Sequence, residues 1–180
     1  MPRSQRALLK LYDDCSEQVR GYFEHFRPLI ENYPYEVALS YAFGQVELAQ
    51  TMTLYCGVVK IHRVDARLAR AAVDAYHMSR AGFLGKVEAI YGKPLPKAAQ
   101  RKLTSAEGVR DKVMHGKGAS DQEKRTALAN VLRYAEAVNA FLDPVAGLQP
   151  FGSLRGFKGR ARSLDRSTSR WVLKGMGFPV

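Results

Sequence analysis

Apolar side chains recur every three or four positions along most of the first 145 residues, a spacing that predicts amphipathic helices. The first series predicts one helix from about Ser4 to Arg27, ended by Pro28. Its apolar positions are Leu8, Tyr12, Cys15, Val19, Tyr22 and Phe26. No stretch shows a convincing strand pattern, so the hydrophobic periodicity favours an all-α protein.

The segment from about Tyr35 to Ile61 is apolar on most of its circumference. Such a helix is either the central helix of a bundle or the seam of a dimer. Gly44 and Gly57 would allow another backbone to approach it closely. A third helix is expected from an N-cap at Asp65 to about Tyr91, where a Gly- and Pro-containing run ends it.

Two further helices form a predicted α-hairpin. The first runs from about Lys97 to His115, and glycines at 116 and 118 end it. The second begins with a capping box, Ser120 to Glu123, and ends before Pro144. Its predicted core positions are Leu128, Val131, Ala135, Val138 and Leu142. We therefore expect residues 1–145 to form an up-down bundle of about five helices.

The composition changes from Ala146 onward, where glycines alternate with aromatic and basic residues. Residues 151–180 contain one acid, Asp165, and seven basic side chains, which leaves +6 of the total charge of +11. The basic side chains are Arg155, Lys158, Arg160, Arg162, Arg166, Arg170 and Lys174. We expect residues 146–180 to form a basic C-terminal extension with a short helix from about Ser163 to Lys174.

Three roles for this extension stay open on the sequence alone. Its basic side chains could follow an RNA backbone while Phe151, Phe157 and Trp171 stack on bases. It could instead pack back on the bundle with its charges solvated. It could also dock a cognate antitoxin, which would have to be acidic. The predicted short helix would carry Leu164, Thr168 and Trp171 on one side.

The formal net charge of +11 and the pI near 9.8 point to an anionic partner, with nucleic acid first and an anionic membrane surface second. An uninvolved basic surface is the alternative. No stretch approaches the length of a membrane span. Cys15 and Cys56 lie in apolar patterns and predict buried thiols in a reducing compartment, so we expect a cytoplasmic protein. No Cys, His or carboxylate spacing predicts a metal site, and no cofactor is expected.

The residues that could perform acid–base or phosphate chemistry lie close to Arg110 in the sequence. On a helical wheel this arginine lies in the apolar arc between Ala106 and Val113, where an unpaired charge is costly to bury. It should therefore pair with an acid, such as Glu107 or one on another helix, or line a cleft that a phosphate can reach. Asp111 and His115 lie four apart on the shoulder of the same helix. His115 could alternatively be a histidine that the helix dipole favours at a C-terminus.

Arg110, the polar Asp111 and His115 at the start of the hairpin loop resemble the motif of the HEPN superfamily, small helical domains found in many prokaryotic ribonuclease toxins and defence proteins. The resemblance covers roughly residues 35–142. Arg20 with His25 and Arg70 with His77 have similar spacing, but the pattern predicts no turn followed by a new helix after either histidine.

The resemblance implies a metal-independent endoribonuclease in which a 2′-hydroxyl attacks the adjacent phosphate. His115 would be the general acid/base, Arg110 would hold the phosphate, and Asp111 would orient one of them or position RNA. It also implies a homodimer, because five residues rise about 7.5 Å along a helix and one arginine and one histidine cannot easily bracket one phosphate. A toxin subgroup has a modified tyrosine where this chain has Lys117, so that mode of regulation is not expected.

Further basic residues are expected to bind the RNA: Lys112, Lys117, Arg155, Lys158, Arg160 and Arg162. Two alternatives belong to other functional classes. The chain could be a non-catalytic HEPN-like module that binds RNA or nucleotides, or a helical interaction protein without a nucleic-acid role.

Overall fold

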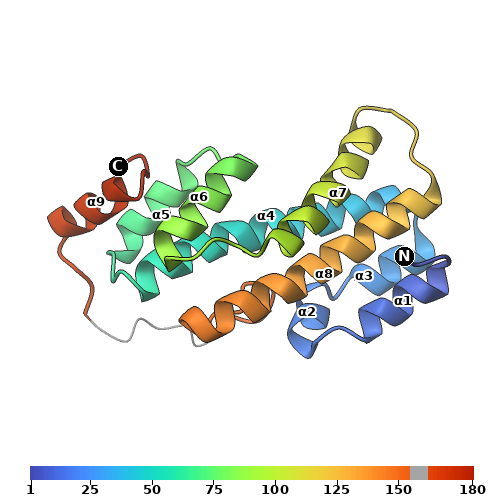
Figure 1. The fold of residues 1–180 in the computed structure, drawn as a ribbon, viewed down its shortest axis with the longest axis horizontal. Coiled ribbons are helices and arrows are strands. Elements are labelled where there is room, and N and C mark those ends of the chain that lie inside the picture. The colour runs from blue at the N-terminus through green and yellow to red at the C-terminus, as the bar shows by residue number, and fades with distance from the viewer. Residues whose placement is uncertain (155–161) are drawn as a thin grey trace. The chain divides into compact units, whose positions relative to one another are not determined.

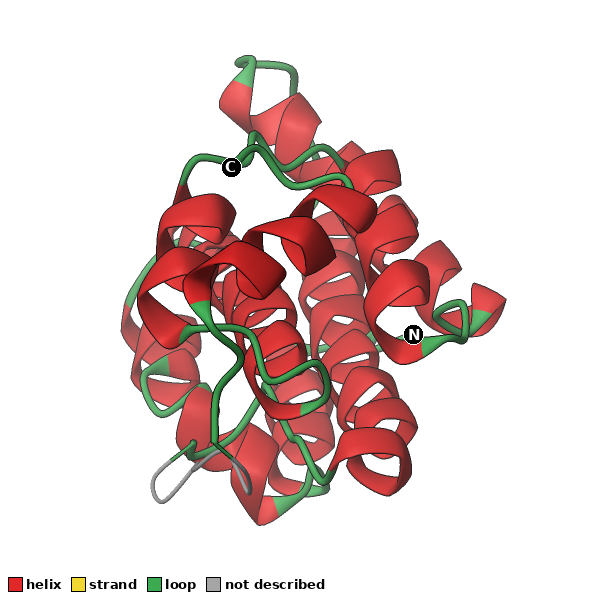
Figure 2. Cartoon of the chain, turned by 90° about the vertical axis from the view of Figure 1, so that its left-hand side faces the viewer, coloured by secondary structure: helices red, strands yellow, loops and turns green. Residues whose placement is uncertain are grey.

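The computed structural model describes residues 1–154 and 162–180, and these contain helices and loops but no strand (Figure 2). The all-α prediction is confirmed. The described helices are α1 (Gln5–Asp13), α2 (Glu17–Tyr22), α3 (Phe26–Asn32), α4 (Tyr35–Lys60), α5 (Ala66–Asp74), α6 (Arg80–Tyr91), α7 (Lys97–Met114), α8 (Asp121–Ala146) and α9 (Arg166–Gly175) (Figure 1). None of these helices is both long and apolar enough to cross a bilayer.

The chain forms two compact units, each assembled from separated segments. Unit 1 contains Met1–Glu47, Pro96–Ala140 and Phe151–Ser153. Unit 2 contains Leu48–Leu95, Phe141–Pro150 and Leu154–Val180. The motif hairpin therefore belongs to unit 1 up to Ala140. Whether residues 146–180 act as a separate extension stays a prediction.

The prediction of one helix from Ser4 to Arg27 is wrong, because the chain turns twice and forms α1, α2 and α3. Acidic side chains are unfavourable at a helix C-terminus, and α1 ends at Asp13. The hydroxyl of Ser16 then accepts a hydrogen bond from the Val19 N–H and caps α2. Pro28 does not end a helix but lies in the first turn of α3, where a missing N–H costs little.

The core of unit 1 contains an aromatic cluster. The ring of Phe151 stacks on Phe23 at 6.0 Å and meets Tyr22 and Tyr134 edge-on. The buried Asn139 amide donates to the Phe151 carbonyl at 2.9 Å and accepts from its N–H at 3.0 Å. Phe151 is therefore a core residue of unit 1, and the suggestion that it stacks on RNA bases is wrong. Phe157 lies outside the described residues.

Unit 2 contains the second half of α4 with α5, α6 and α9. A Cβ added at Gly57 would lie 2.6 Å from both the Ile90 Cγ2 and the Tyr91 hydroxyl, so side chains, and not the backbone expected from the sequence, pack closely on Gly57. The same test finds open space at Gly44, so no residue of the described ranges approaches it closely. The helix expected from Asp65 to Tyr91 divides into α5 and α6, because Ser79 caps a new helix by accepting from the Gly82 N–H.

The last two helices differ from expectation in detail. The predicted core positions of α8 are all buried, but the helix continues through Pro144 to Ala146. The α9 helix buries Ser169 and Leu173, not the predicted side, and Trp171 is 80% exposed. The apolar side of α9 is therefore set by its packing in unit 2.

Candidate functional site

The turn after α7 is fixed by the backbone around a left-handed glycine. Gly116 has φ of 67° and donates to the carbonyl of Val113, while the Lys117 N–H donates to the carbonyl of Lys112 at 2.8 Å. These two bonds form a Schellman motif, the usual way to satisfy the last carbonyls of a helix. His115 is the C-cap residue immediately before it.

The structure confirms the predicted capping box, which fixes the start of α8. The Glu123 Oε2 accepts from the Ser120 N–H at 2.8 Å and from the Ser120 hydroxyl at 2.9 Å. Its Oε1 lies 2.8 Å from the Lys112 ammonium at the end of α7. The Lys112 ammonium and the two Ser120 donors lower the pKa of Glu123 to about 2. The turn that carries His115 is therefore bound to both helices.

Arg110 projects from α7 toward α4 within unit 1. Its guanidinium carbon lies 5.5 Å from the centre of the Phe43 ring, and its two terminal nitrogens lie 3.6 Å from Glu47 and 3.5 Å from Asp111. The Arg110 side chain is 38% exposed to solvent. Charge-assisted hydrogen bonds are about 2.7–2.9 Å long, so these two ion pairs are loose. Of the two alternatives for Arg110, the structure shows pairing with acids, one of them on another helix, and Glu107 is not one of these two acids.

His115 is exposed at the end of α7. Its backbone N–H donates to the Asp111 carbonyl at 3.1 Å. Among the described residues, no hydrogen bond or ion pair joins its ring to Arg110 or Asp111. The structure thus brings Arg110 and Asp111 together and leaves the His115 ring pointing to solvent from a well-defined backbone.

The residues predicted to bind RNA lie in different surroundings. Lys112 is held by Glu123, whereas Lys117 is exposed in the turn. Arg162 is exposed in unit 2, where its carbonyl accepts two hydrogen bonds from the Arg63 guanidinium. Three of the predicted residues lie outside the described residues: Arg155, Lys158 and Arg160.

Three residues that contact the motif were not identified from the sequence. Phe43 and Glu47, one helical turn apart on α4, form the surface against which Arg110 lies. Their spacing is a signal for a shared face, but the pairing of α4 with α7 is a long-range contact. Glu123 was recognised as a capping residue, but its ion pair with Lys112 was not.

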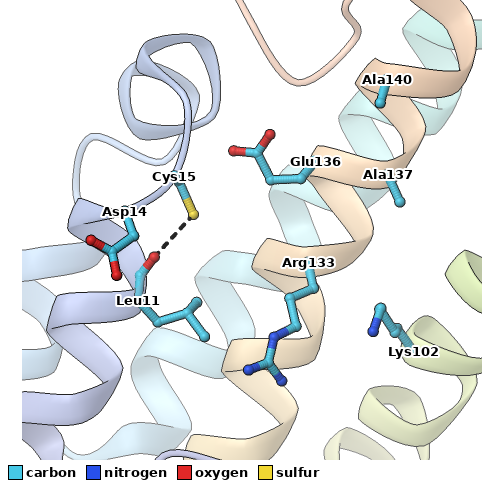
Figure 3. A pocket seen from close by; sticks show the side chains of 8 residues that line it. All are labelled: Leu11, Asp14, Cys15, Lys102, Arg133, Glu136, Ala137 and Ala140. Carbon is cyan, nitrogen blue, oxygen red and sulfur yellow. Dashed lines mark hydrogen bonds between the residues drawn. The ribbon is translucent and has the colours of Figure 1, made fainter.

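A cleft of about 520 Å³ lies along α8 in unit 1 (Figure 3). Its walls are largely apolar, with opposite charges at Glu136 and Arg133, and the Cys15 thiol donates to the Leu11 carbonyl. Burial, with a smaller effect of Glu136, raises the pKa of Cys15 to about 12, so this thiol is not a nucleophile near neutral pH.

A second cleft, of about 610 Å³, surrounds the buried Lys124. Its ammonium pairs with Glu36 at 2.6 Å and with Asp121 at 2.9 Å. Neither this cleft nor the one along α8 is lined by a residue of the motif.

Within the described ranges, no group of three or more His, Cys, Asp or Glu side chains is placed to hold a metal ion. No family model, curated protein or solved structure matches this chain. The geometry of the α7–α8 hairpin is therefore the basis for inferring a function.

Proposed function

We propose that this chain is a metal-independent endoribonuclease of the HEPN type, active as a homodimer and acting as a toxin or defence effector. The observation that carries this proposal is the position of His115. It is exposed beside a turn that a Schellman motif and a capping box define, one and a half helical turns after the half-exposed Arg110.

The proposed reaction is an internal transesterification. The His115 imidazole removes the proton of a ribose 2′-hydroxyl, whose oxygen attacks the adjacent phosphorus. The bond from phosphorus to the 5′-oxygen breaks, and that oxygen takes a proton from the His115 imidazolium, which returns to the neutral imidazole. The products are a 2′,3′-cyclic phosphate and a 5′-hydroxyl. Histidine suits the proton transfer because imidazole ordinarily titrates near neutral pH.

Arg110 would stabilise the negative charge on the phosphorane. The loose contacts of its guanidinium with Glu47 and Asp111 leave donors that a phosphate oxygen could take at shorter distance. The face of Phe43 would keep the guanidinium oriented while these partners exchange. Asp111, next to Arg110, would hold the guanidinium in position between turnovers.

A second copy of the chain would complete the site. Five residues along α7 separate Arg110 from His115 by about 7.5 Å, too far for both to reach one phosphate easily. We propose that Arg110 of one copy and His115 of the other act on the same phosphate. Within unit 1, Val37 is 43% exposed and Gly44 faces open space seven residues along α4, which offers a surface for such a dimer.

One observation favours a non-catalytic RNA-binding module as the second candidate. No described residue forms a hydrogen bond or ion pair with the His115 ring, whereas a general base is commonly oriented by a partner. This candidate predicts RNA binding with a steep salt dependence and no cleavage.

The test is the cleavage rate of purified variants on RNA. His115→Ala should lower the rate by about 100- to 10,000-fold, the usual contribution of general acid–base catalysis, with RNA affinity nearly unchanged. Arg110→Ala should lower it strongly as well. His77→Ala is the matched control, since His77 is exposed, follows Arg70 at a similar spacing and lies outside the hairpin. Wild-type cleavage by His115→Ala would overturn the proposal.

A further inference from the structure

The α9 helix is attached to unit 2 by one side only. The Asp65 N–H, just before α5, donates to the Ser169 hydroxyl at 3.0 Å, and α9 lies beside α5 (Figure 1). Leu173 is fully buried, and Phe178, three residues after the helix, is also buried. Asp165 caps the helix by accepting from the Thr168 N–H at 2.9 Å. The outer side of α9 is therefore presented on a fixed helix.

That outer side combines one large aromatic ring with cations. Trp171 is 80% exposed, the highest exposure of any large apolar side chain in the described part of the chain except Met1. Arg170 and Lys174, four residues apart, are both exposed. Lys174 lies three residues after Trp171 on a neighbouring part of the helix surface, and Arg170 lies at the edge of the buried side, three residues before Leu173. The one acid of residues 162–180, Asp165, is engaged as the helix cap. This face has no negative charge of its own to balance the cations.

We propose that Trp171, Arg170 and Lys174 form a platform that holds single-stranded RNA. An exposed indole offers a face on which an unpaired base stacks, and flanking cations pair with the phosphates on either side. The inference rests on the proposed function, which identifies the bound polymer as RNA. It adds a binding surface made of unit 2 residues, none of which belongs to the motif of Arg110 and His115. It selects single strands, because the bases of a duplex are already stacked.

An anionic membrane is the competing partner for a basic helix with an exposed tryptophan. Membrane-surface helices bury a continuous apolar side in the lipid interface. The buried side of α9 already packs inside unit 2 through Leu173, and the Ser169 hydroxyl on that side accepts a hydrogen bond from Asp65. Trp171 is the one large apolar side chain of α9 that is largely exposed, and Val172 is only partly exposed, so the helix offers no continuous apolar side to a bilayer.

The chain contains one tryptophan, so its fluorescence reports on this surface alone. We would titrate the full-length His115→Ala protein with single-stranded RNA, because this variant should leave the RNA nearly uncleaved during the measurement. The RNA would be about twelve nucleotides long, within the range that such binding surfaces cover. The expected result is saturable quenching that weakens with salt. Duplex RNA of the same length should quench much less, and vesicles of phosphatidylserine and phosphatidylcholine should cause no blue shift. Absence of quenching by the single strand, or a blue shift with vesicles, would overturn the proposal.

Variants separate stacking from charge. Trp171→Ala should weaken binding of labelled single-stranded RNA by about 5- to 100-fold, whereas Trp171→Phe should keep most of the affinity. Tyr33→Ala is the matched control, because Tyr33 is an aromatic residue of unit 1 that is 58% exposed. Replacing Arg170 and Lys174 together by Ala should reduce the slope of log affinity against log salt by about 1.4. Equal affinities of Trp171→Ala and wild type would refute stacking.

The same assays distinguish this inference from the proposed nuclease. If the wild type cleaves RNA but Trp171 is not quenched, the platform is refuted and the nuclease stands. If Trp171 is quenched but no RNA is cleaved, the nuclease is refuted and the platform stands. If both hold, Trp171→Ala should raise the KM for RNA and leave kcat unchanged, since Trp171 lies outside the reacting group.

Discussion

The ammonium of Lys112 lies 2.8 Å from the carboxylate of Glu123, and this ion pair joins the end of α7 to the start of α8 across the turn that carries His115. The second oxygen of the same carboxylate accepts from the N–H and the hydroxyl of Ser120. One side chain therefore contacts both ends of the turn that carries the proposed catalytic histidine.

The contacts of Glu123 should make the stability of the folded protein depend on pH in the acid range. The pKa of Glu123 falls from an ordinary 4.5 to about 2 in the folded protein, mainly through Lys112. The stabilisation is therefore complete above the ordinary value and is lost as pH falls through about 2. Glu123→Gln should lower the urea midpoint at neutral pH and lose less stability than wild type on acidification. Equal acid sensitivity of the two proteins would contradict this, and Glu88→Gln on the exposed side of α6 is the control.

Close packing at Gly57 predicts opposite effects for two glycine-to-alanine changes. The Cβ of Gly57→Ala would lie 2.6 Å from Ile90 and Tyr91, so the variant should lose about 1–3 kcal/mol of unfolding free energy. Gly108 is also helical but has nothing within 4 Å, so Gly108→Ala should gain up to about 1 kcal/mol. Chemical denaturation of both variants measures the difference. A Gly57→Ala protein as stable as wild type would show that the packing is looser than described.

The amide of Asn139 satisfies both backbone groups of Phe151 inside unit 1. Asn139→Ala would leave a buried N–H and a buried carbonyl without these partners, at a cost of about 1–3 kcal/mol for each orphaned group. We therefore expect a loss of at least about 2 kcal/mol in denaturant unfolding. Asn32→Ala is the control, because the Asn32 amide donates to the Pro28 carbonyl at an exposed position. Similar losses for the two variants would argue against a special role of Asn139.

A shared site predicts complementation between inactive variants. In a heterodimer of His115→Ala with Arg110→Ala, one site receives the intact Arg110 and the intact His115, and the other receives neither. Random mixing makes about half of the dimers heterodimers, so about one quarter of the wild-type activity should return. The cleavage rate after subunit exchange measures this. No recovery, with exchange verified, would refute the two-copy site.

The hairpin could be predicted in detail because its signals are local. Gly116 and the capping residues Ser120 and Glu123 act within a few positions of themselves, so their roles follow from sequence order. The contact of Arg110 with Phe43 and Glu47 joins α7 to α4, more than sixty residues apart. The sequence left open whether Arg110 pairs with an acid or lines a cleft, and it could not identify these partners.

The misassigned elements also have physical reasons. Periodicity continued from Leu8 through Phe26 because all three N-terminal helices bury side chains in one core, although the backbone turns between them. For α9, the apolar positions Leu164 and Trp171 suggested one side, but the buried hydroxyl of Ser169 receives a hydrogen bond from Asp65 and fixes another. A polar residue buried by a long-range hydrogen bond has no signature in hydrophobic periodicity.

The most direct test of the central claim is end-group analysis of RNA incubated with purified wild-type protein in EDTA, beside His115→Ala. We predict fragments with 2′,3′-cyclic phosphate and 5′-hydroxyl ends from the wild type, and at least about 100-fold fewer fragments with His115→Ala over the same time. Intact RNA with the wild type, or identical fragments from both proteins, would contradict a nuclease centred on Arg110 and His115.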